Sequence, residues 1–255
     1  MRQTNLGNRG QIHMSETRVR LNRYLAASGV CSRRAADRII LTEKVKVNGR
    51  PVTELGTKID PNVDRVTVNG RRVVASTEVI FIALNKPRGY LTTMKDERGR
   101  KCVKDLVKGV GGRVFPVGRL DKDTEGLLLF SNDGFAAHRL MHPSFGVEKV
   151  YRVTLDKPLS GKQLSSLKQG VVLVDGVARV SKVRQLQKEG EVLELTIKEG
   201  RKREIRRIFR KLGTHLIRLQ RVRFGPIVLG GLSRGKWRRL SKAEISQIRK
   251  AIRIE

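Results

Sequence analysis

The sequence is poor in features that mark several large classes of protein. Only two of its 255 residues are cysteines, Cys31 and Cys102, which excludes a disulfide framework and a zinc site built from cysteines. Apolar runs such as 126–130 and 225–232 are far shorter than the roughly 20 residues of a membrane helix. No apolar stretch typical of a secretory signal follows Met1. We therefore expect a cytoplasmic protein that does not span a membrane.

Acidic residues are scarce beside basic ones. The chain has 24 Asp and Glu against 55 Lys and Arg, for a formal net charge of +31. A folded chain with this charge repels itself unless a polyanion binds, and nucleic acid is the usual partner. An anionic membrane surface is the alternative, but aromatic residues make up only 4%, which disfavours insertion into lipid.

Motifs for metals and nucleotide cofactors are also missing. His138 and His142 have the spacing of metal ligands on a helix, but no cysteine lies nearby and the Glu of an HExxH motif is absent. The sequence has neither a GxxxxGK[ST] phosphate loop nor a GxGxxG turn between a strand and a helix. We therefore expect no metal and no cofactor.

We predict a disordered tail over residues 1–17 and a small separate domain over residues 18–75. Leu21, Tyr24 and Leu25 have helical spacing, and Ser32 can cap a second helix. Two Asn-Gly pairs, 48–49 and 69–70, each follow alternating valines and predict hairpin turns. The expected domain has two short helices followed by a small sheet.

Two adjacent arginines, Arg33 and Arg34, lie in the first turn of the second expected helix. A helix N-terminus beside two guanidiniums indicates a phosphate site, although a solvated helix end would explain either arginine alone. Residues 18–65 resemble the S4 RNA-binding domain through the segments 20–26, 32–36 and 45–52. The resemblance implies binding to structured RNA through Arg33, Arg34 and Lys46.

Residues 79–252 predict a second domain of mixed strands and helices. Apolar or alternating segments predict strands over 79–84, 126–131, 150–155 and 193–197. Helices are expected over 133–141, over 205–212, and after Ser241, which forms a capping box with Glu244. Few spacings suit a strand–helix–strand unit, so we predict an α+β fold with a mixed, largely antiparallel sheet flanked by helices.

The turn at 118–125 is acidic in an otherwise basic chain. Asp121, Asp123 and Glu125 would repel RNA phosphates. Such carboxylates commonly bond to local backbone in a turn. The other interpretation is a working carboxylate in a basic pocket, where an arginine keeps it ionised. The residues alone leave both interpretations open.

A resemblance to ribosomal RNA pseudouridine synthases, in the branch with an N-terminal S4 domain, favours the second interpretation. Its main motif is Gly-Arg-Leu-Asp at 118–121 followed by Thr-Glu-Gly-Leu-Leu at 124–128. Further motifs lie at 85–90, 131–134, 138–140, 149–151, 199–209, 218–219 and 225–227. One departure is Glu204, where the branch often has Gln. Glutamine can donate a hydrogen bond and glutamate cannot.

The resemblance implies roles for four residues. Asp121 would be the catalytic carboxylate, which either attacks C1′ or removes a C2′ proton. Tyr151 would stack on the target base, Arg206 would pair with Asp121, and Arg119 would support the flipped nucleotide. Core packing for Tyr151 and a solvated helix face for Arg206 are the alternatives.

The implied activity is the isomerisation of a uridine to pseudouridine in ribosomal RNA, by a protein that we expect to be a monomer. Its expected partner is ribosomal RNA or a ribosomal precursor particle. Thr124 and Glu125, which follow the Asp-Lys-Asp segment, make the motif most similar to the large-subunit group. The alternatives are a small-subunit synthase and a non-enzymatic rRNA-binding or assembly protein, which would need no acidic turn.

Overall fold

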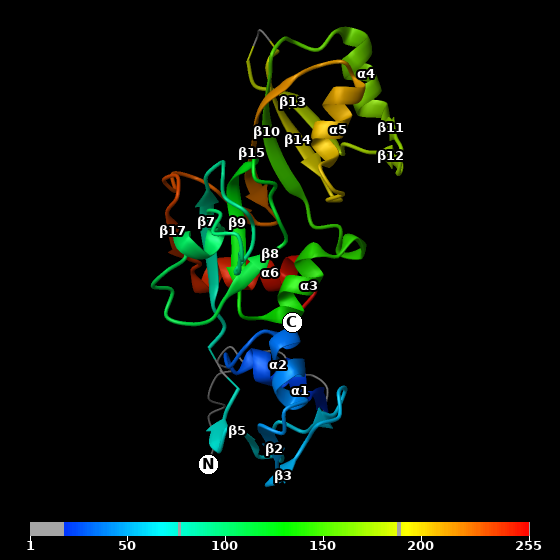
Figure 1. Ribbon diagram of the computed structural model, residues 1–255. Helices are drawn as coiled ribbons and strands as arrows, with labels where there is room; N and C mark the ends of the chain where they lie inside the picture. Colours follow the sequence, from blue (N-terminus) through cyan, green and yellow to red (C-terminus); the bar gives the residue numbers. More distant parts are fainter. Residues whose placement is uncertain (1–17, 76–77, 188–189, 255) are drawn as a thin grey trace, which may run out of the picture. The chain divides into compact units, whose positions relative to one another are not determined.

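The computed structural model describes residues 18–75, 78–187 and 190–254, so the tail expected over 1–17 lies outside the described residues. The chain divides into two compact units (Figure 1). The first comprises residues up to Ile80 with 111–114 and 132–135, and the second comprises 81–110, 115–131 and the rest of the chain from Ala136. The domain borders at 18–75 and 79–252 stay predictions.

The described residues of the first unit form two helices and two small sheets. Its elements are β1 (Val19–Arg20), α1 (Leu21–Ala27), α2 (Arg33–Ile40), β2 (Val45–Val47), β3 (Arg50–Pro51), β4 (Lys58–Ile59), β5 (Val66–Val68) and β6 (Arg71–Val73). The larger sheet has the antiparallel order β3-β2-β5-β6, and β1 pairs with β4.

Local signals in the first unit form as predicted. The Ser32 side chain accepts the N–H of Ala35 at 3.2 Å and caps α2. Asn48 and Gly49 both take positive φ, 52° and 82°, as the tight hairpin between β2 and β3 requires. Apolar side chains from both helices and the strands bury one another in a core that includes Leu25.

From Phe81 onward the chain builds one large sheet with helices. Its elements are β7 (Phe81–Lys86), β8 (Phe115–Val117), β9 (Glu125–Ser131), α3 (Gly134–Met141), β10 (Lys149–Leu155), α4 (Gly161–Gln169), β11 (Val171–Leu173), β12 (Gly176–Ala178), β13 (Lys182–Gln185), β14 (Val192–Ile197), α5 (Glu204–Lys211), β15 (Leu216–Phe224), β16 (Ile227–Val228), β17 (Trp237–Arg239) and α6 (Lys242–Ala251), with short 3-10 helices at Val103–Leu106 and Pro143–Phe145.

The sheet has the order β13-β14-β10-β15-β9-β7-β17, with β8 beside β9 and β16 beside β15. Among its described strands, β9 and β15 alone pair in parallel. This confirms the predicted α+β fold with a mixed, largely antiparallel sheet. Helix α5 packs on β15 and β11, with the predicted stripe of Ile205, Ile208 and Phe209 buried.

The sequence patterns did not predict α4 or the β11–β12 hairpin, which forms a two-stranded sheet of its own. The apolar signal of α4 is weak, whereas the hairpin has a readable one, the apolar run 171–174 followed by Asp-Gly at 175–176, which was overlooked. Only Leu167 of α4 is buried, and Val172 and Val174 on the hairpin are exposed. None of the described helices has the length and apolarity that crossing a membrane requires.

The parallel β9–β15 pair depends on Gly126. This residue pairs with Arg221 and has a φ of 99°, a value that side chains with a Cβ rarely adopt. A Cβ at this position would collide with the main chain of Arg221. Glycine therefore lets the two strands approach directly after the acidic turn.

Candidate active site

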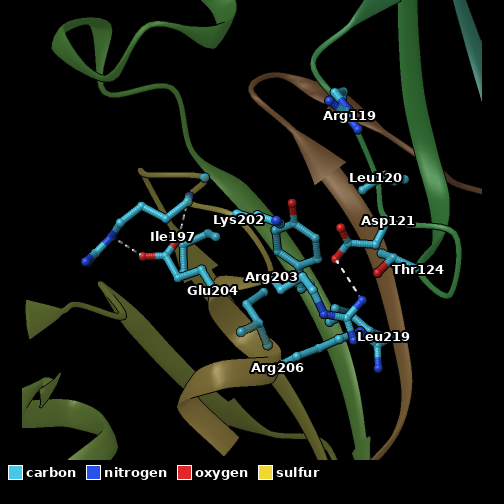
Figure 2. A pocket seen from close by; sticks show the side chains of 14 residues that line it. Arg119, Leu120, Asp121, Thr124, Ile197, Lys202, Arg203, Glu204, Arg206 and Leu219 are labelled. Atoms are coloured by element: carbon cyan, nitrogen blue, oxygen red, sulfur yellow. Dashed lines mark hydrogen bonds and ion pairs between the residues drawn. The ribbon is translucent and has the colours of Figure 1, made fainter. Parts of the chain in front are cut away.

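A cavity of about 510 Å³ opens in the second unit (Figure 2). The turn before β9, Tyr151 on β10 and the start of α5 form its walls. The lining residues are Arg119, Leu120, Asp121, Thr124, Tyr151, Ile197, 200–206 and Leu219. The structure thus brings Arg119, Asp121, Tyr151 and Arg206 to one cavity, although the motifs that supply them are far apart in the sequence.

Lys86 lies beneath the acidic turn and is fully buried. Its Nζ donates to the main-chain oxygens of Thr124 at 2.8 Å, Pro87 at 3.1 Å and Asp121 at 3.2 Å. Burial lowers the pKa of Lys86 to about 8, and the nearby carboxylates, Asp121 first, oppose this shift. Sequence reasoning gave Lys86 no role, although a lysine close behind the apolar run 79–84 was a signal.

The carboxylate of Asp121 is partly exposed and faces the start of α5. Within the described part of the chain, the cation in ion-pair distance is Arg203, whose Nη1 lies 4.0 Å from Asp121 Oδ2 (Figure 2). The same Nη1 lies 4.0 Å from Asp123 Oδ2. One guanidinium is therefore shared by two carboxylates of the turn.

Arg206 makes a different contact from the one that the resemblance implied. Its Nη2 donates to the main-chain oxygen of Asp123 at 3.0 Å. Burial and the adjacent Arg203 lower the pKa of Arg206, while Asp123 and Asp121 act in the opposite direction. Arg206 thus supports the backbone of the turn, and the carboxylate of Asp121 lies nearest to Arg203.

Tyr151 is buried, its hydroxyl contacts one cation, and a second buried cation lies two residues earlier on the same strand. Its hydroxyl accepts from Nη1 of Arg221 at 3.5 Å, and Arg221 Nε donates to Leu127 O at 2.7 Å. Lys149, two residues before Tyr151, donates from Nζ to the main-chain oxygens of Lys198 at 3.3 Å and Glu199 at 3.4 Å. Burial lowers the pKa of Lys149 to about 8. These bonds connect β10 to β9 and to the segment before α5.

Comparison with known proteins identifies this arrangement. The family model described as RNA pseudouridylate synthase matches residues 80–211, and the S4 domain model matches residues 19–64. The chain belongs to the RNA pseudouridine synthase family. This confirms the resemblance, the S4 domain and an enzyme of the isomerase class.

Several relatives match nearly the whole chain. An RNA pseudouridine synthase of Aquifex aeolicus, termed uncharacterized, is 44% identical over 240 residues, which are 93% of this chain and 96% of that protein. Ribosomal large subunit pseudouridine synthase B of Bacillus subtilis is 41% identical over 235 residues, 90% of this chain and 95% of that protein. A crystal structure of a pseudouridylate synthase has 28% identity and a TM-score of 0.64, and the match covers 90% of this chain and 99% of that one.

In this pseudouridine synthase the position of Glu204 has a clear structural use. The buried Glu204 carboxylate accepts the N–H of Arg201 at 3.1 Å and its Nε at 3.2 Å. Burial raises the pKa of Glu204, and the bonds to Arg201 oppose the shift. Two donors meet two carboxylate oxygens here, whereas a glutamine has only one oxygen to accept with.

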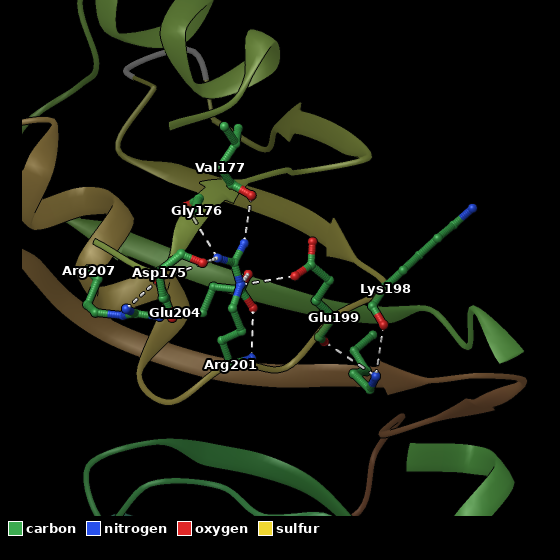
Figure 3. Close-up of polar contacts among 9 residues, drawn as sticks. Asp175, Gly176, Val177, Lys198, Glu199, Arg201, Glu204 and Arg207 are labelled. Carbon is green, nitrogen blue, oxygen red and sulfur yellow. Dashed lines mark hydrogen bonds and ion pairs between the residues drawn. The ribbon is translucent and has the colours of Figure 1, made fainter. Parts of the chain in front are cut away.

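Arg201 also fastens the β11–β12 hairpin to the start of α5 (Figure 3). Its Nη2 donates to Val177 O at 2.7 Å, and its Nη1 donates to Asp175 O at 3.1 Å. Arg207 binds both carboxylate oxygens of Asp175, at 2.8 and 2.9 Å. This network connects the segment 200–206 and the first turn of α5 to the hairpin.

The residues assigned to RNA binding lie in the first unit, on the S4 domain. Arg33 and Arg34 are exposed in the first turn of α2, and Lys46 is exposed on β2. Their positions leave the side chains free to reach phosphates, but their role stays a prediction.

Proposed function

We propose that the protein isomerises one specific uridine to pseudouridine in ribosomal RNA, and that the RNA is the 23S RNA of the large subunit. The observation that carries the proposal is the cavity that joins Asp121, Tyr151 and a set of arginines. Two further facts support the RNA assignment: the matched S4 domain, and the match to the Bacillus subtilis protein named as a large-subunit synthase.

Asp121 is proposed as the group that breaks the bond between N1 and C1′. In one course, a carboxylate oxygen bonds to C1′ while the electron pair of the N1–C1′ bond leaves on uracil N1. In the other, the carboxylate takes the C2′ proton, the pair of the C2′–H bond forms a C1′=C2′ double bond, and N1 leaves with the pair of the N1–C1′ bond. The described residues are compatible with both courses.

The second half of the reaction joins C5 to C1′ after the uracil rotates. The new bond displaces the Asp121 carboxylate in the first course, or C2′ regains its proton from Asp121 in the second. C5 then loses its proton to solvent and N1 gains one, so the product is an isomer and no electrons are exchanged with a cofactor. A cavity that holds the free uracil against Tyr151 would keep it from escaping.

The surrounding side chains have supporting roles in this proposal. Tyr151 stacks on the uracil, Arg119 binds the flipped nucleotide, and Arg206 holds the turn through the Asp123 main chain. The target nucleotide must leave its stack, which costs a few kcal/mol and is easiest in a loop or bulge. Arg33, Arg34 and Lys46 would bind phosphates elsewhere on the RNA and supply a salt-dependent grip.

The test uses the purified protein and transcripts of 23S and 16S rRNA labelled with tritium at uracil C5. Release of tritium from 23S RNA by wild type, and none by Asp121→Asn with unchanged RNA affinity, is the expected result. Release from 16S RNA alone would refute the substrate assignment. Release from 23S and another RNA would indicate a wider specificity. A relative from Escherichia coli is named a dual-specificity RNA pseudouridine synthase. It is 36% identical, and the match covers 94% of this chain and 81% of that protein.

A further inference from the structure

One face of the large sheet carries a row of polar side chains, which we call the polar row. Neighbouring strands place its members directly opposite one another, in the order Arg184, Glu194, Arg152, Gln220 and Glu125. They come from β13, β14, β10, β15 and β9, which are consecutive in the sheet. Strands lie about 4.8 Å apart, so the row is roughly 19 Å long. Residues that pair directly across a sheet share one face, and the row is therefore one continuous surface.

The polar row and the cavity lie on opposite faces of the sheet. Side chains alternate between the two faces of a strand, and the residues next to the row on β14, β10 and β15 pair with one another as Leu195, Tyr151 and Arg221. All three are buried, and Tyr151 lines the cavity together with the start of α5. By contrast, the side chains of Arg152 and Arg184 are 48% and 70% exposed.

Glu194, in the middle of the row, binds an arginine on each side. Arg152 Nη2 donates to Oε1 at 3.3 Å, and Arg184 Nη2 donates to Oε2 at 2.6 Å. Desolvation alone would raise the pKa of Glu194, but the bonds from Arg184 and Arg152 together lower it below its usual value. The carboxylate is therefore charged and fixes two guanidiniums at the surface.

Glu125, at the end of the row, repeats this arrangement. Its Oε1 accepts from Nε of Arg218, and its Oε2 lies 3.5 Å from Nη2 of Arg234. The Glu125 side chain is only 2% exposed, whereas those of Arg218 and Arg234 are 46% and 61% exposed. Arg218 lies two residues before Gln220 on β15 and thus on the same face. Each glutamate of the row holds one arginine on each carboxylate oxygen.

Support of the sheet does not account for two cations on each glutamate. One arginine would neutralise one carboxylate, and exposed ion pairs between strands contribute little to folding. Four arginines on two carboxylates leave two positive charges without compensation. Each guanidinium also keeps N–H donors for which the described residues offer no other acceptor. Guanidiniums held in place with donors to spare are well suited to phosphate oxygens.

We propose that the polar row, with Arg218 and Arg234, is a second RNA-binding surface that binds the phosphates of a double-stranded segment of the substrate RNA. This inference rests on the RNA substrate of the proposed function. A single-stranded segment would need aromatic side chains on which its bases stack, and the row has none. Double-stranded RNA is recognised mostly through its backbone and shape, which a row of arginines can contact. Because the row and the cavity lie on opposite faces, an RNA that contacts both at once must be large and structured, as ribosomal RNA is.

The test is filter binding to poly(I)·poly(C), a duplex, and to poly(C), a single strand, over a range of salt concentrations. Arg184→Gln/Arg234→Gln removes the two uncompensated charges and leaves each glutamate one arginine, so the melting temperature should stay within about 2 °C of wild type. We expect duplex affinity to fall by about 3- to 10-fold, and the salt slope of log K to fall by about 0.7–0.9 for each lost contact. Affinity for poly(C) should change by less than about twofold.

Lys162→Gln/Lys168→Gln is the matched control, because it removes the same charge from exposed lysines of α4. This helix is bound to the end of α5 through Gln163, whose Nε2 donates to Leu212 O at 2.7 Å, and not to the polar row. Its duplex affinity should stay within about twofold of wild type. Arg184→Gln alone, on the edge strand β13, should show about half of the change in salt slope of the double variant.

Three outcomes would overturn the inference. Equal losses for the arginine and lysine pairs would mean that net charge alone explains binding. Equal losses for poly(I)·poly(C) and poly(C) would refute the assignment to a duplex. Unchanged duplex affinity with a lowered melting temperature would make the row a device of stability. Neither polymer contains uridine, so these results do not depend on isomerisation: a protein that shows the predicted losses but releases no tritium from 23S rRNA would refute the proposed function alone.

Discussion

Replacing Lys86 by methionine tests whether a buried ammonium holds the reactive turn. Methionine keeps an unbranched apolar body but cannot donate to the main-chain oxygens of Thr124, Pro87 and Asp121. Each buried acceptor that loses its donor costs about 1–3 kcal/mol. Because methionine also avoids the desolvation of a buried charge, we expect a net loss of about 2–4 kcal/mol in the free energy of unfolding.

The pH dependence of this loss can be calculated from the pKa of Lys86. Burial lowers that pKa to about 8 from an ordinary value of 10.5. Between these values the unfolded chain binds more protons than the folded one, so the free energy of unfolding rises with pH. A shift of this size corresponds to a gain on the order of 3 kcal/mol. The deficit of Lys86→Met relative to wild type should therefore grow from about pH 8 to pH 10.5.

The assay is urea denaturation of wild type and Lys86→Met between pH 7 and pH 10.5, with single-turnover tritium release measured at pH 7. Turnover should fall together with stability, since the turn that bears Asp121 loses its support. Lys162→Met, a change at an exposed lysine of α4, is the control and should stay within about 0.5 kcal/mol of wild type. A deficit that is the same at every pH, or smaller than the control's change, would refute this account of Lys86.

Three further predictions follow from the fold and the site. Gly126→Ala should lower the free energy of unfolding, measured by urea denaturation, by about 3 kcal/mol or more, because the new Cβ meets the β15 backbone. A free energy of unfolding equal to that of wild type would contradict the close β9–β15 approach. Glu204→Gln should cost about 1 kcal/mol by the same method, since it keeps one of two acceptors for Arg201, whereas Glu204→Leu should cost about 2–3 kcal/mol; equal losses would show that the hydrogen bonds do not matter. Deletion of residues 1–75 should weaken rRNA binding in a filter-binding assay and reduce the salt slope of log K by about 0.7–0.9 for each lost phosphate contact. The remaining residues should stay folded by circular dichroism. If they are unfolded, the two-domain division is wrong.

Local signals in the sequence were sufficient for much of the secondary structure. Ser32, the Asn-Gly pairs and the stripe on α5 act within a few residues of chain, so their structural consequences are readable without the fold. The α+β class follows from the same patterns. The α4 helix was missed because only one of its side chains is buried. The strand β15 was missed because basic residues interrupt its apolar pattern. The β11–β12 hairpin had a local signal in Asp175-Gly176 that was overlooked.

For the site, the sequence alone determined that an acidic turn with Asp121 stands out in a basic chain, and its motifs indicated the family. Only the tertiary structure decided which groups meet Asp121. Lys86 enters beneath the turn because β7 pairs with β9. Arg203, at the N-terminus of α5, comes within 4.0 Å of the carboxylate, whereas Arg206 contacts the main chain of the turn. Both facts depend on strand pairing and backbone angles, which the spacing of residue types does not specify.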